Sequence, residues 1–137
     1  MIFVDTGAFV ARYMARDEHH EDALVGFALL ERDRVPAATS IHVLDETITL
    51  LARWAGGGFA AERARAIFAS RALQVWRPTE DHEVEALQEL ERFADQGIGY
   101  TDALSFVLMR ERDVAEAFTF DRHFQLAGFS LWPAGIS

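Results

Sequence analysis

The sequence predicts an α/β domain with a mostly parallel sheet of five strands, covered by helices on both faces. Short apolar runs alternate along the chain with longer stretches of helical periodicity. Successive strands separated by helices need crossover connections, which favour a parallel sheet with helices packed on both sides. The length of 137 residues suits one domain spanning residues 1–137, and a hydrophobic content of 50% argues against disorder.

Five apolar runs are predicted as strands. The first, Ile2–Val4, is apolar throughout, as expected of a strand buried on both faces. The second is the weakest, because it contains a proline and two alanines. The four later strands are expected at about Val35–Ala38, Leu73–Trp76, Glu116–Phe120 and Phe129–Trp132.

Six helices fill the intervals, and several have recognisable capping residues. Thr39 or Ser40 can cap the third helix and Thr79 the fifth, since hydroxyl side chains accept from the free amides of a first turn. Gly56-Gly57-Gly58 predicts a turn between the third and fourth helices. The helices are expected at about Ala8–Ala15, Glu18–Arg32, Ile41–Ala55, Phe59–Arg71, Glu80–Ala94 and Tyr100–Arg112.

Composition excludes several classes of protein. The chain has no cysteine, which excludes disulfides and thiolate metal sites and fits a reducing cytoplasm. The N-terminus lacks the pattern of a signal peptide, and no apolar run approaches the ~18 residues of a membrane span. The net charge is −9, and all 13 basic residues are arginines. Such a charge repels nucleic acid unless the acids converge on cations.

Two aspartates follow predicted strands directly. Asp5 comes after the first strand and Asp121 after the fourth. In open parallel sheets the ligand site lies beyond the carboxyl ends of the strands. Either aspartate could instead be an ordinary helix cap, so the argument depends on the other acids nearby.

Glu46 and Asp102 supply those acids. On its predicted helix Glu46 shares a face with Val43, Leu50 and Trp54, so it interrupts an apolar stripe. It therefore either reaches solvent at the edge of the stripe or is compensated by another group. Asp102 begins an apolar helix, where an acid also suits the helix dipole.

Four clustered carboxylates predict a site for Mg²⁺ or Mn²⁺. These hard cations prefer oxygen ligands, and carboxylates crowded together without a cation repel one another. Bound cations can lower the pKa of a water molecule and clamp phosphate oxygens for in-line attack. The candidate catalytic and metal-binding residues are Asp5, Glu46, Asp102 and Asp121.

Across nearly its whole length the chain resembles the PIN-domain family, especially the VapC toxins of toxin–antitoxin pairs. Each of the four acids lies in a segment similar to one of the family's four acidic motifs, in the same order. These segments are Ile2–Phe9, Thr39–Thr47, Asp95–Phe106, and Phe118–Phe124 followed by Gly128-Phe129.

The resemblance implies a three-layer α/β/α fold and a metal-dependent ribonuclease. It implies hydrolysis of RNA that leaves a 5′-phosphate and a 3′-hydroxyl. It also implies a homodimer and, for a toxin, a small antitoxin that binds in a groove near the early helices. Members outside toxin pairs exist, so an RNA-processing nuclease and a non-catalytic binding module stay open as alternatives.

Other residues and other functions are less favoured. His19-His20 could bind zinc, but adjacent residues face different sides of a helix, so a solvated helix start is the better interpretation. The aromatic residues Phe27, Trp54, Phe68, Trp76 and Phe106 are expected in the core. An aspartyl phosphatase would need a second aspartate two residues after Asp5. A phospho-receiver domain would need a lysine, and the chain has none.

Overall fold

The five strands form one parallel sheet in the order β3-β2-β1-β4-β5. The computed structural model describes residues 1–135. Val4 is in register with Phe118, and Phe3 with Ala38, so β1 lies at the centre of the sheet between β2 and β4. The strands are β1 (Ile2–Val4), β2 (Ala37–Ser40), β3 (Leu73–Trp76), β4 (Glu116–Phe118) and β5 (Ser130–Leu131).

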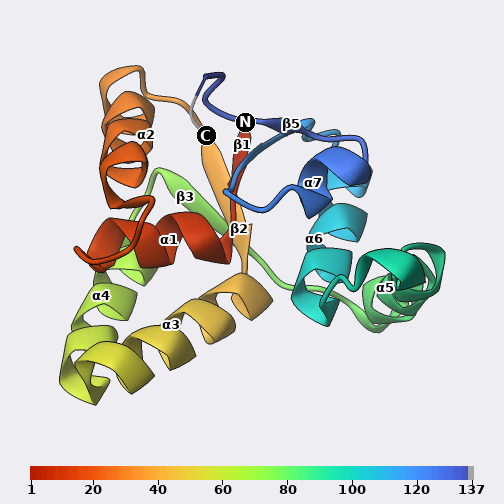
Figure 1. Ribbon diagram of the computed structural model, residues 1–137, viewed down its shortest axis with the longest axis horizontal. Helices are drawn as coiled ribbons and strands as arrows, with labels where there is room; N and C mark the ends of the chain where they lie inside the picture. Colours follow the sequence, from red (N-terminus) through yellow and green to blue (C-terminus); the bar gives the residue numbers. More distant parts are fainter. Residues whose placement is uncertain (136–137) are drawn as a thin grey trace.

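Helices cover both faces of this sheet. In Figure 1, α1 to α4 lie on one side of the strands and α5 to α7 on the other. The expected three-layer α/β/α fold is thereby confirmed. The helices are α1 (Thr6–Tyr13), α2 (His20–Arg32), α3 (Ile41–Ala55), α4 (Gly57–Ala69), α5 (Glu80–Arg92), α6 (Tyr100–Glu111) and α7 (His123–Leu126), with a 3₁₀ turn at Ala94–Gln96.

The strand order reverses at the boundary between β1 and β4. From β1 the chain moves outward through β2 to β3, and it then crosses to the other side of β1 to form β4 and β5. Connections on the two sides of this boundary lie on opposite faces of the sheet. A cleft lined by Asp5 and Asp121 lies at the carboxyl ends of β1 and β4. Asp5 and Asp121, which follow these two strands, are therefore placed at the position where open α/β sheets bind ligands.

The interior is built largely from aromatic rings on both faces of the sheet. Phe3 is fully buried and packs against Trp76 and Phe124 at ring-centroid distances of 5.7 and 6.5 Å. On the other layer Phe27 lies 5.0 Å from Phe118. Within the described part of the chain, none of the helices has the length and hydropathy needed to cross a membrane.

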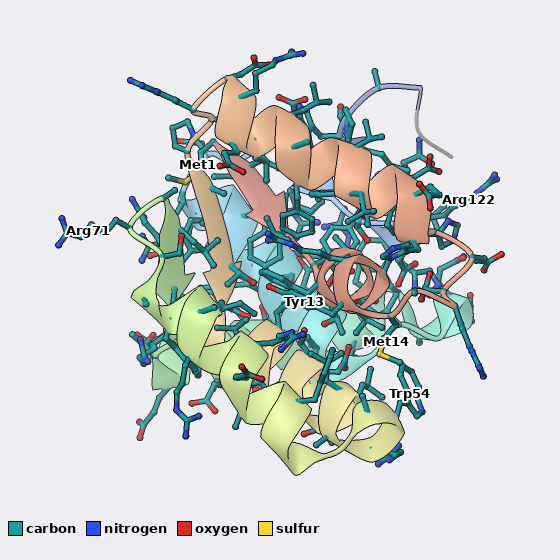
Figure 2. All side chains as sticks on the ribbon, turned by 90° about the vertical axis from the view of Figure 1, so that its left-hand side faces the viewer. Met1, Tyr13, Met14, Trp54, Arg71 and Arg122 are labelled. Carbon is teal, nitrogen blue, oxygen red and sulfur yellow. The ribbon has the colours of Figure 1, made fainter. Side chains whose placement is uncertain are left out.

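Several predicted boundaries and two predicted core residues were wrong. β2 begins two residues later than expected, at Ala37, because Val35 and Pro36 belong to the connection that leads into it. Gly57 and Gly58 lie inside α4 rather than in a turn. Trp54 and Phe68 are 55% and 47% exposed. Figure 2 shows the Trp54 side chain standing out from the end of α3.

Candidate active site

The four predicted acids come together in one cleft at the carboxyl ends of β1 and β4. This acidic cleft has a volume of about 540 Å³. Its walls come from α1, the α1–α2 connection, α3, the start of α6 and the β4–α7 connection. The lining residues are Asp5, Thr6, Gly7, Val10, His19, Glu46, Leu50, Gly99, Thr101, Asp102, Thr119, Phe120, Asp121 and Arg122.

Asp5 is buried at the bottom of this cleft, with 4% of its surface exposed. Its backbone amide donates to the carbonyl of Phe118, which extends the β1–β4 ladder to the site. Although Asp5 occupies the N-cap position of α1, its side chain accepts no capping hydrogen bond. Instead Asp5 Oδ2 accepts from Thr119 Oγ1 at 2.8 Å, while Oδ1 is buried and has no hydrogen-bond partner among residues 1–135. The Asp5 side chain therefore does not cap α1, and one of its oxygens is left without a partner among the described residues.

Asp121 is fixed by the turn that follows β4. Its Oδ1 accepts from the backbone amide of His123 at 2.9 Å, and its own amide donates to Thr119 Oγ1 at 3.0 Å. The imidazole of His123 also faces the acids, with Nδ1 3.2 Å from Asp121 Oδ1 and 3.6 Å from Asp102 Oδ2. Ligand atoms of Asp102, Asp121 and His123 lie within 4.8 Å of one another, close enough to share one metal ion.

The electrostatics of the site favour protons or cations. Burial raises the pKa of Asp5 to about 6, against the opposing effect of its hydrogen bond from Thr119. Burial also raises the pKa of Asp102 to about 8, and the negative charges of Asp5 and Asp121 add to the shift. In the absence of a cation, Asp102 therefore holds a proton at neutral pH, as expected of carboxylates confined together.

Glu46 lies at the exposed edge of the cleft. The buried side of α3 carries Val43, Leu44, Thr47 and Leu51, so the apolar face is rotated from the stripe that the sequence indicated. Of the two alternatives for Glu46, the structure shows the solvent-exposed edge. Glu46 still lines the cleft, and its charge contributes to the raised pKa values of Asp5 and Asp102.

The two adjacent histidines do not form a zinc site. His20 Nδ1 pairs with the carbonyl of Ala11 at 2.6 Å, whereas His19 turns into the acidic cleft and stacks on Phe120. Within residues 1–135, His123 is the histidine that joins a group of possible metal ligands. The stack of His19 on Phe120 was not predicted, because no local pattern relates two residues from such distant parts of the chain.

Comparison with known proteins agrees with this geometry. A sequence profile described as the PIN domain matches residues 2–130. This chain belongs to the PIN-domain family. It is also 39% identical over 130 residues to the 23S rRNA-specific endonuclease VapC20 of Mycobacterium tuberculosis, a match that covers 94% of this chain and 95% of VapC20.

A solved relative has the same fold. The crystal structure of Mycobacterium tuberculosis VapC20, described as a sarcin–ricin loop cleaving toxin, superposes with a TM-score of 0.84 at 37% identity. The match covers 94% of this chain and 96% of that structure. These comparisons confirm three predictions: that the chain belongs to the PIN family, that it resembles VapC toxins and that it is a ribonuclease.

Proposed function

We propose that the acidic cleft is the active site of a Mg²⁺- or Mn²⁺-dependent endoribonuclease, and that this chain is the toxin of a toxin–antitoxin pair. The observation that carries the proposal is the buried, unpartnered Oδ1 of Asp5 within residues 1–135, beside an Asp102 whose pKa is raised to about 8. A buried carboxylate oxygen with nothing to accept from is costly. A divalent cation would satisfy it and remove the repulsion among the acids.

The donor set fits such a cation. Asp5, Asp102 and Asp121 offer carboxylate oxygens from three elements, and Glu46 offers a fourth from the edge of the cleft. Oxygen donors of this kind suit Mg²⁺ and Mn²⁺. The imidazole of His123 lies beside two of them and is an additional donor that Mn²⁺ accepts more readily than Mg²⁺ does.

A bound cation would supply Lewis-acid chemistry, lowering the pKa of an attacking water and neutralising charge on the phosphate. The side chains of the protein would orient the metal ligands and accept protons. Thr119 fixes the orientation of Asp5, and the His123 amide fixes that of Asp121. Glu46 is exposed and sits at the mouth of the cleft, where it can accept a proton from water. The chain contains no cysteine or lysine nucleophile, which suits direct attack by water.

The substrate class follows from the relatives. VapC20 is named for 23S rRNA and for cleavage of the sarcin–ricin loop. The PIN-domain profile matches residues 2–130, a range that contains every residue lining the acidic cleft. We propose that this chain likewise cuts a looped segment of 23S rRNA. A processing nuclease outside toxin pairs is the second candidate, and a PIN fold without catalysis is the third.

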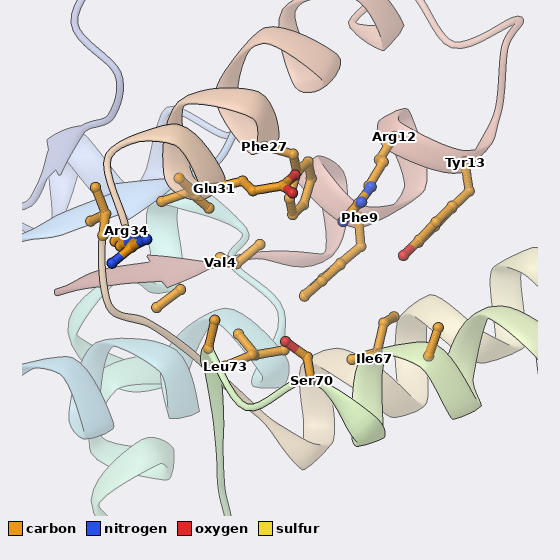
Figure 3. A pocket seen from close by; sticks show the side chains of 15 residues that line it. Val4, Phe9, Arg12, Tyr13, Phe27, Glu31, Arg34, Ile67, Ser70 and Leu73 are labelled. Atoms are coloured by element: carbon orange, nitrogen blue, oxygen red, sulfur yellow. The ribbon is translucent and has the colours of Figure 1, made fainter.

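We propose that the antitoxin binds in a groove between α2 and α4, shown in Figure 3. The groove has a volume of about 510 Å³ and is lined mainly by apolar side chains such as Phe9, Phe27 and Ile67. Arg12 and Arg34 border it, and the Arg12 guanidinium lies 4.4 Å from the centre of the Phe27 ring. The expected partner is an antitoxin segment that presents apolar side chains together with carboxylates.

We also propose that the chain is one PIN domain that works as a homodimer in the cytoplasm. Trp54 and Phe68, large apolar side chains on α3 and α4, are about half exposed in the single chain. A second copy that covers them would recover their burial. A monomer mass by light scattering across micromolar concentrations would refute the dimer.

The central test is cleavage of a sarcin–ricin hairpin RNA by the purified protein. Cleavage is expected with Mg²⁺ or Mn²⁺, with 5′-phosphate and 3′-hydroxyl ends, and it should stop in excess EDTA. The Glu91→Gln variant is a matched control, because Glu91 is an exposed acid outside the cleft. Undiminished cleavage in EDTA, from a preparation in which an Asp5→Asn variant is inactive, would refute the metal dependence.

A further inference from the structure

Two rings from distant parts of the chain form a stacked pair in the wall of the acidic cleft. The imidazole of His19 and the ring of Phe120 have centroids 4.3 Å apart and planes inclined by 3°. His19 comes from the connection between α1 and α2, and Phe120 from the connection between β4 and α7. Both line the cleft that contains the four acids. Their contact therefore lies beside the candidate active site and outside the sheet core.

The pair is held in place before any ligand arrives. Phe120 meets the fully buried Phe118 edge to face at 6.1 Å. The backbone amide of His19 donates to Asp17 Oδ1 at 2.8 Å, which fixes the turn that leads into α2. One face of the imidazole is covered by Phe120, yet the side chain keeps 30% of its surface exposed. Part of the imidazole is therefore accessible to a planar group that enters the cleft.

We propose that the His19–Phe120 stack is a platform for an unpaired nucleobase of the RNA, next to the phosphate that is cleaved. The inference rests on the proposed ribonuclease function. Phe120 lies between Thr119, which holds Asp5, and Asp121, which is itself one of the acids. A base resting on this stack belongs to a nucleotide that adjoins the reacting phosphate.

The charge of the molecule explains why such a platform is needed. Four acids in the cleft and a net charge of −9 repel the RNA backbone. Stacking of a base on an aromatic face does not depend on net charge, and every base has a π-face. It requires a base that has left its helix, which is typical of RNA loops. Arg122 also lines the cleft and is exposed, so it can contact a phosphate beside the stacked base.

Most other aromatic contacts of the molecule belong to the core. The rings of Phe3, Phe106 and Phe124 are fully buried and offer no face to solvent. Among the aromatic pairs of the described residues, His19 with Phe120 is the one whose two rings both line the acidic cleft. This position distinguishes the His19–Phe120 pair from the aromatic pairs of the core.

The test measures binding and cleavage of three fluorescent hairpin RNAs. One is the intact sarcin–ricin hairpin. The second has an abasic nucleotide on the 5′ side of the cleaved bond, and the third has one on the 3′ side. Kd is measured by anisotropy in Mg²⁺-free buffer with Ca²⁺, and KM and kcat in Mg²⁺. His19→Ala should weaken binding of the intact hairpin by about ten- to a hundredfold, the range expected for loss of one stacked base. KM should rise while kcat changes little, because the platform binds ground state and transition state alike.

The abasic hairpins identify the contact. The wild-type protein should bind one of them as weakly as His19→Ala binds the intact hairpin, and His19→Ala should lose nothing further on that hairpin. His19→Phe, which keeps a stacking ring, should restore binding. His20→Ala is the matched control, since His20 faces the Ala11 carbonyl rather than the cleft. If His19→Ala does not fold, the same Kd comparison between intact and abasic hairpins is made with His19→Phe and Phe120→Leu. Phe120→Leu should then weaken binding and His19→Phe should not.

Four results separate the possibilities. Unchanged Kd in His19→Ala, or additive losses from His19→Ala and both abasic sites, overturns the platform. Loss of antitoxin binding with unchanged RNA binding also overturns it and assigns the stack to a protein contact. Absence of wild-type cleavage with intact hairpin binding would count against the proposed ribonuclease, while the abasic comparison would still decide the platform.

Discussion

Thr119 donates a hydrogen bond of 2.8 Å to Oδ2 of Asp5, a residue 114 positions earlier in the chain. The same hydroxyl oxygen accepts from the backbone amide of Asp121 at 3.0 Å. One threonine thus ties together the acids that follow the two central strands. Oδ2 of Asp5 is held by Thr119, while Oδ1 is buried and has no hydrogen-bond partner within the described residues.

We expect Thr119→Val to reduce kcat and metal affinity about ten- to a hundredfold, the usual effect of removing a group that orients a metal ligand. Valine has nearly the same shape, so the fold should survive. Metal affinity by calorimetry and cleavage of the hairpin RNA would measure the two effects. Thr49→Val, on the exposed side of α3, is the control. Wild-type metal affinity in Thr119→Val would show that Asp5 needs no such support.

The pH dependence of stability follows from the raised pKa values. In the folded protein the pKa of Asp5 is about 6 and that of Asp102 about 8, against 3.8 for an ordinary aspartate. A carboxyl whose pKa is higher in the folded state binds more protons in that state than in the unfolded one. Its contribution to the free energy of unfolding is therefore complete below about pH 4. That contribution is lost as the pH rises through the pKa of the folded state. Stability of the metal-free protein should therefore fall between about pH 4 and 8 because of these two groups.

Thermal unfolding in EDTA across this range measures the effect. Asp102→Asn removes the group with the larger shift, so the difference in melting temperature between this variant and the wild type should grow in favour of the variant as the pH rises. Added Mn²⁺ should reverse the trend for the wild type, since a cation favours the ionised carboxylates. A pH-independent difference would mean that Asp102 ionises normally.

The order of the elements and the placement of the acids could be predicted from local sequence. Apolar runs mark strands, and an acid directly after a strand lies at the carboxyl edge wherever the sheet is parallel. The placement of Asp5 and Asp121 at this edge follows from that rule alone. The burial of Glu46 could not be predicted from the sequence. Periodicity identifies the apolar side of a helix, but it does not say which edge of that side is covered by the rest of the protein.

Features made by long-range contact could not be predicted. β2 extends to Thr39 and Ser40, which pair in register with Val75 and Trp76 of β3. The buried hydroxyl of Thr39 is satisfied by donating to the carbonyl of Val4, a contact that no local pattern indicates. Trp54 and Phe68 lie in apolar segments, yet they are exposed in the single chain. The stack of His19 on Phe120 likewise depends on two connections that meet only after folding.

Gly26 allows α2 to lie directly on the sheet. A Cβ at this position would lie 2.2 Å from the end of the Phe118 ring, which is fully buried and packs against Phe27 and Trp132. We expect Gly26→Ala to destabilise the protein by about 1–3 kcal/mol, the usual cost of overpacking, despite the better helix propensity of alanine. Denaturant unfolding measures this. Gly58→Ala, in open space at the start of α4, is the control and should be neutral or stabilising. A stabilised Gly26→Ala would show that α2 can shift away from β4.

Asp5→Asn and Asp102→Asn should each abolish RNA cleavage without unfolding the protein, and each should raise the stability of the metal-free form. The two carboxyls are desolvated and repel the other acids, and an amide of the same shape removes that repulsion. Each variant also loses a metal ligand, so the cation no longer activates water.

If the residues were only helix caps, amidation would cost roughly 1 kcal/mol or less and leave activity intact. Asp5 already departs from that expectation, because its side chain makes no capping hydrogen bond within the described chain. Cleavage rates and metal-free melting temperatures of both variants distinguish the two roles, and a wild-type rate in either variant would remove that residue from the active site.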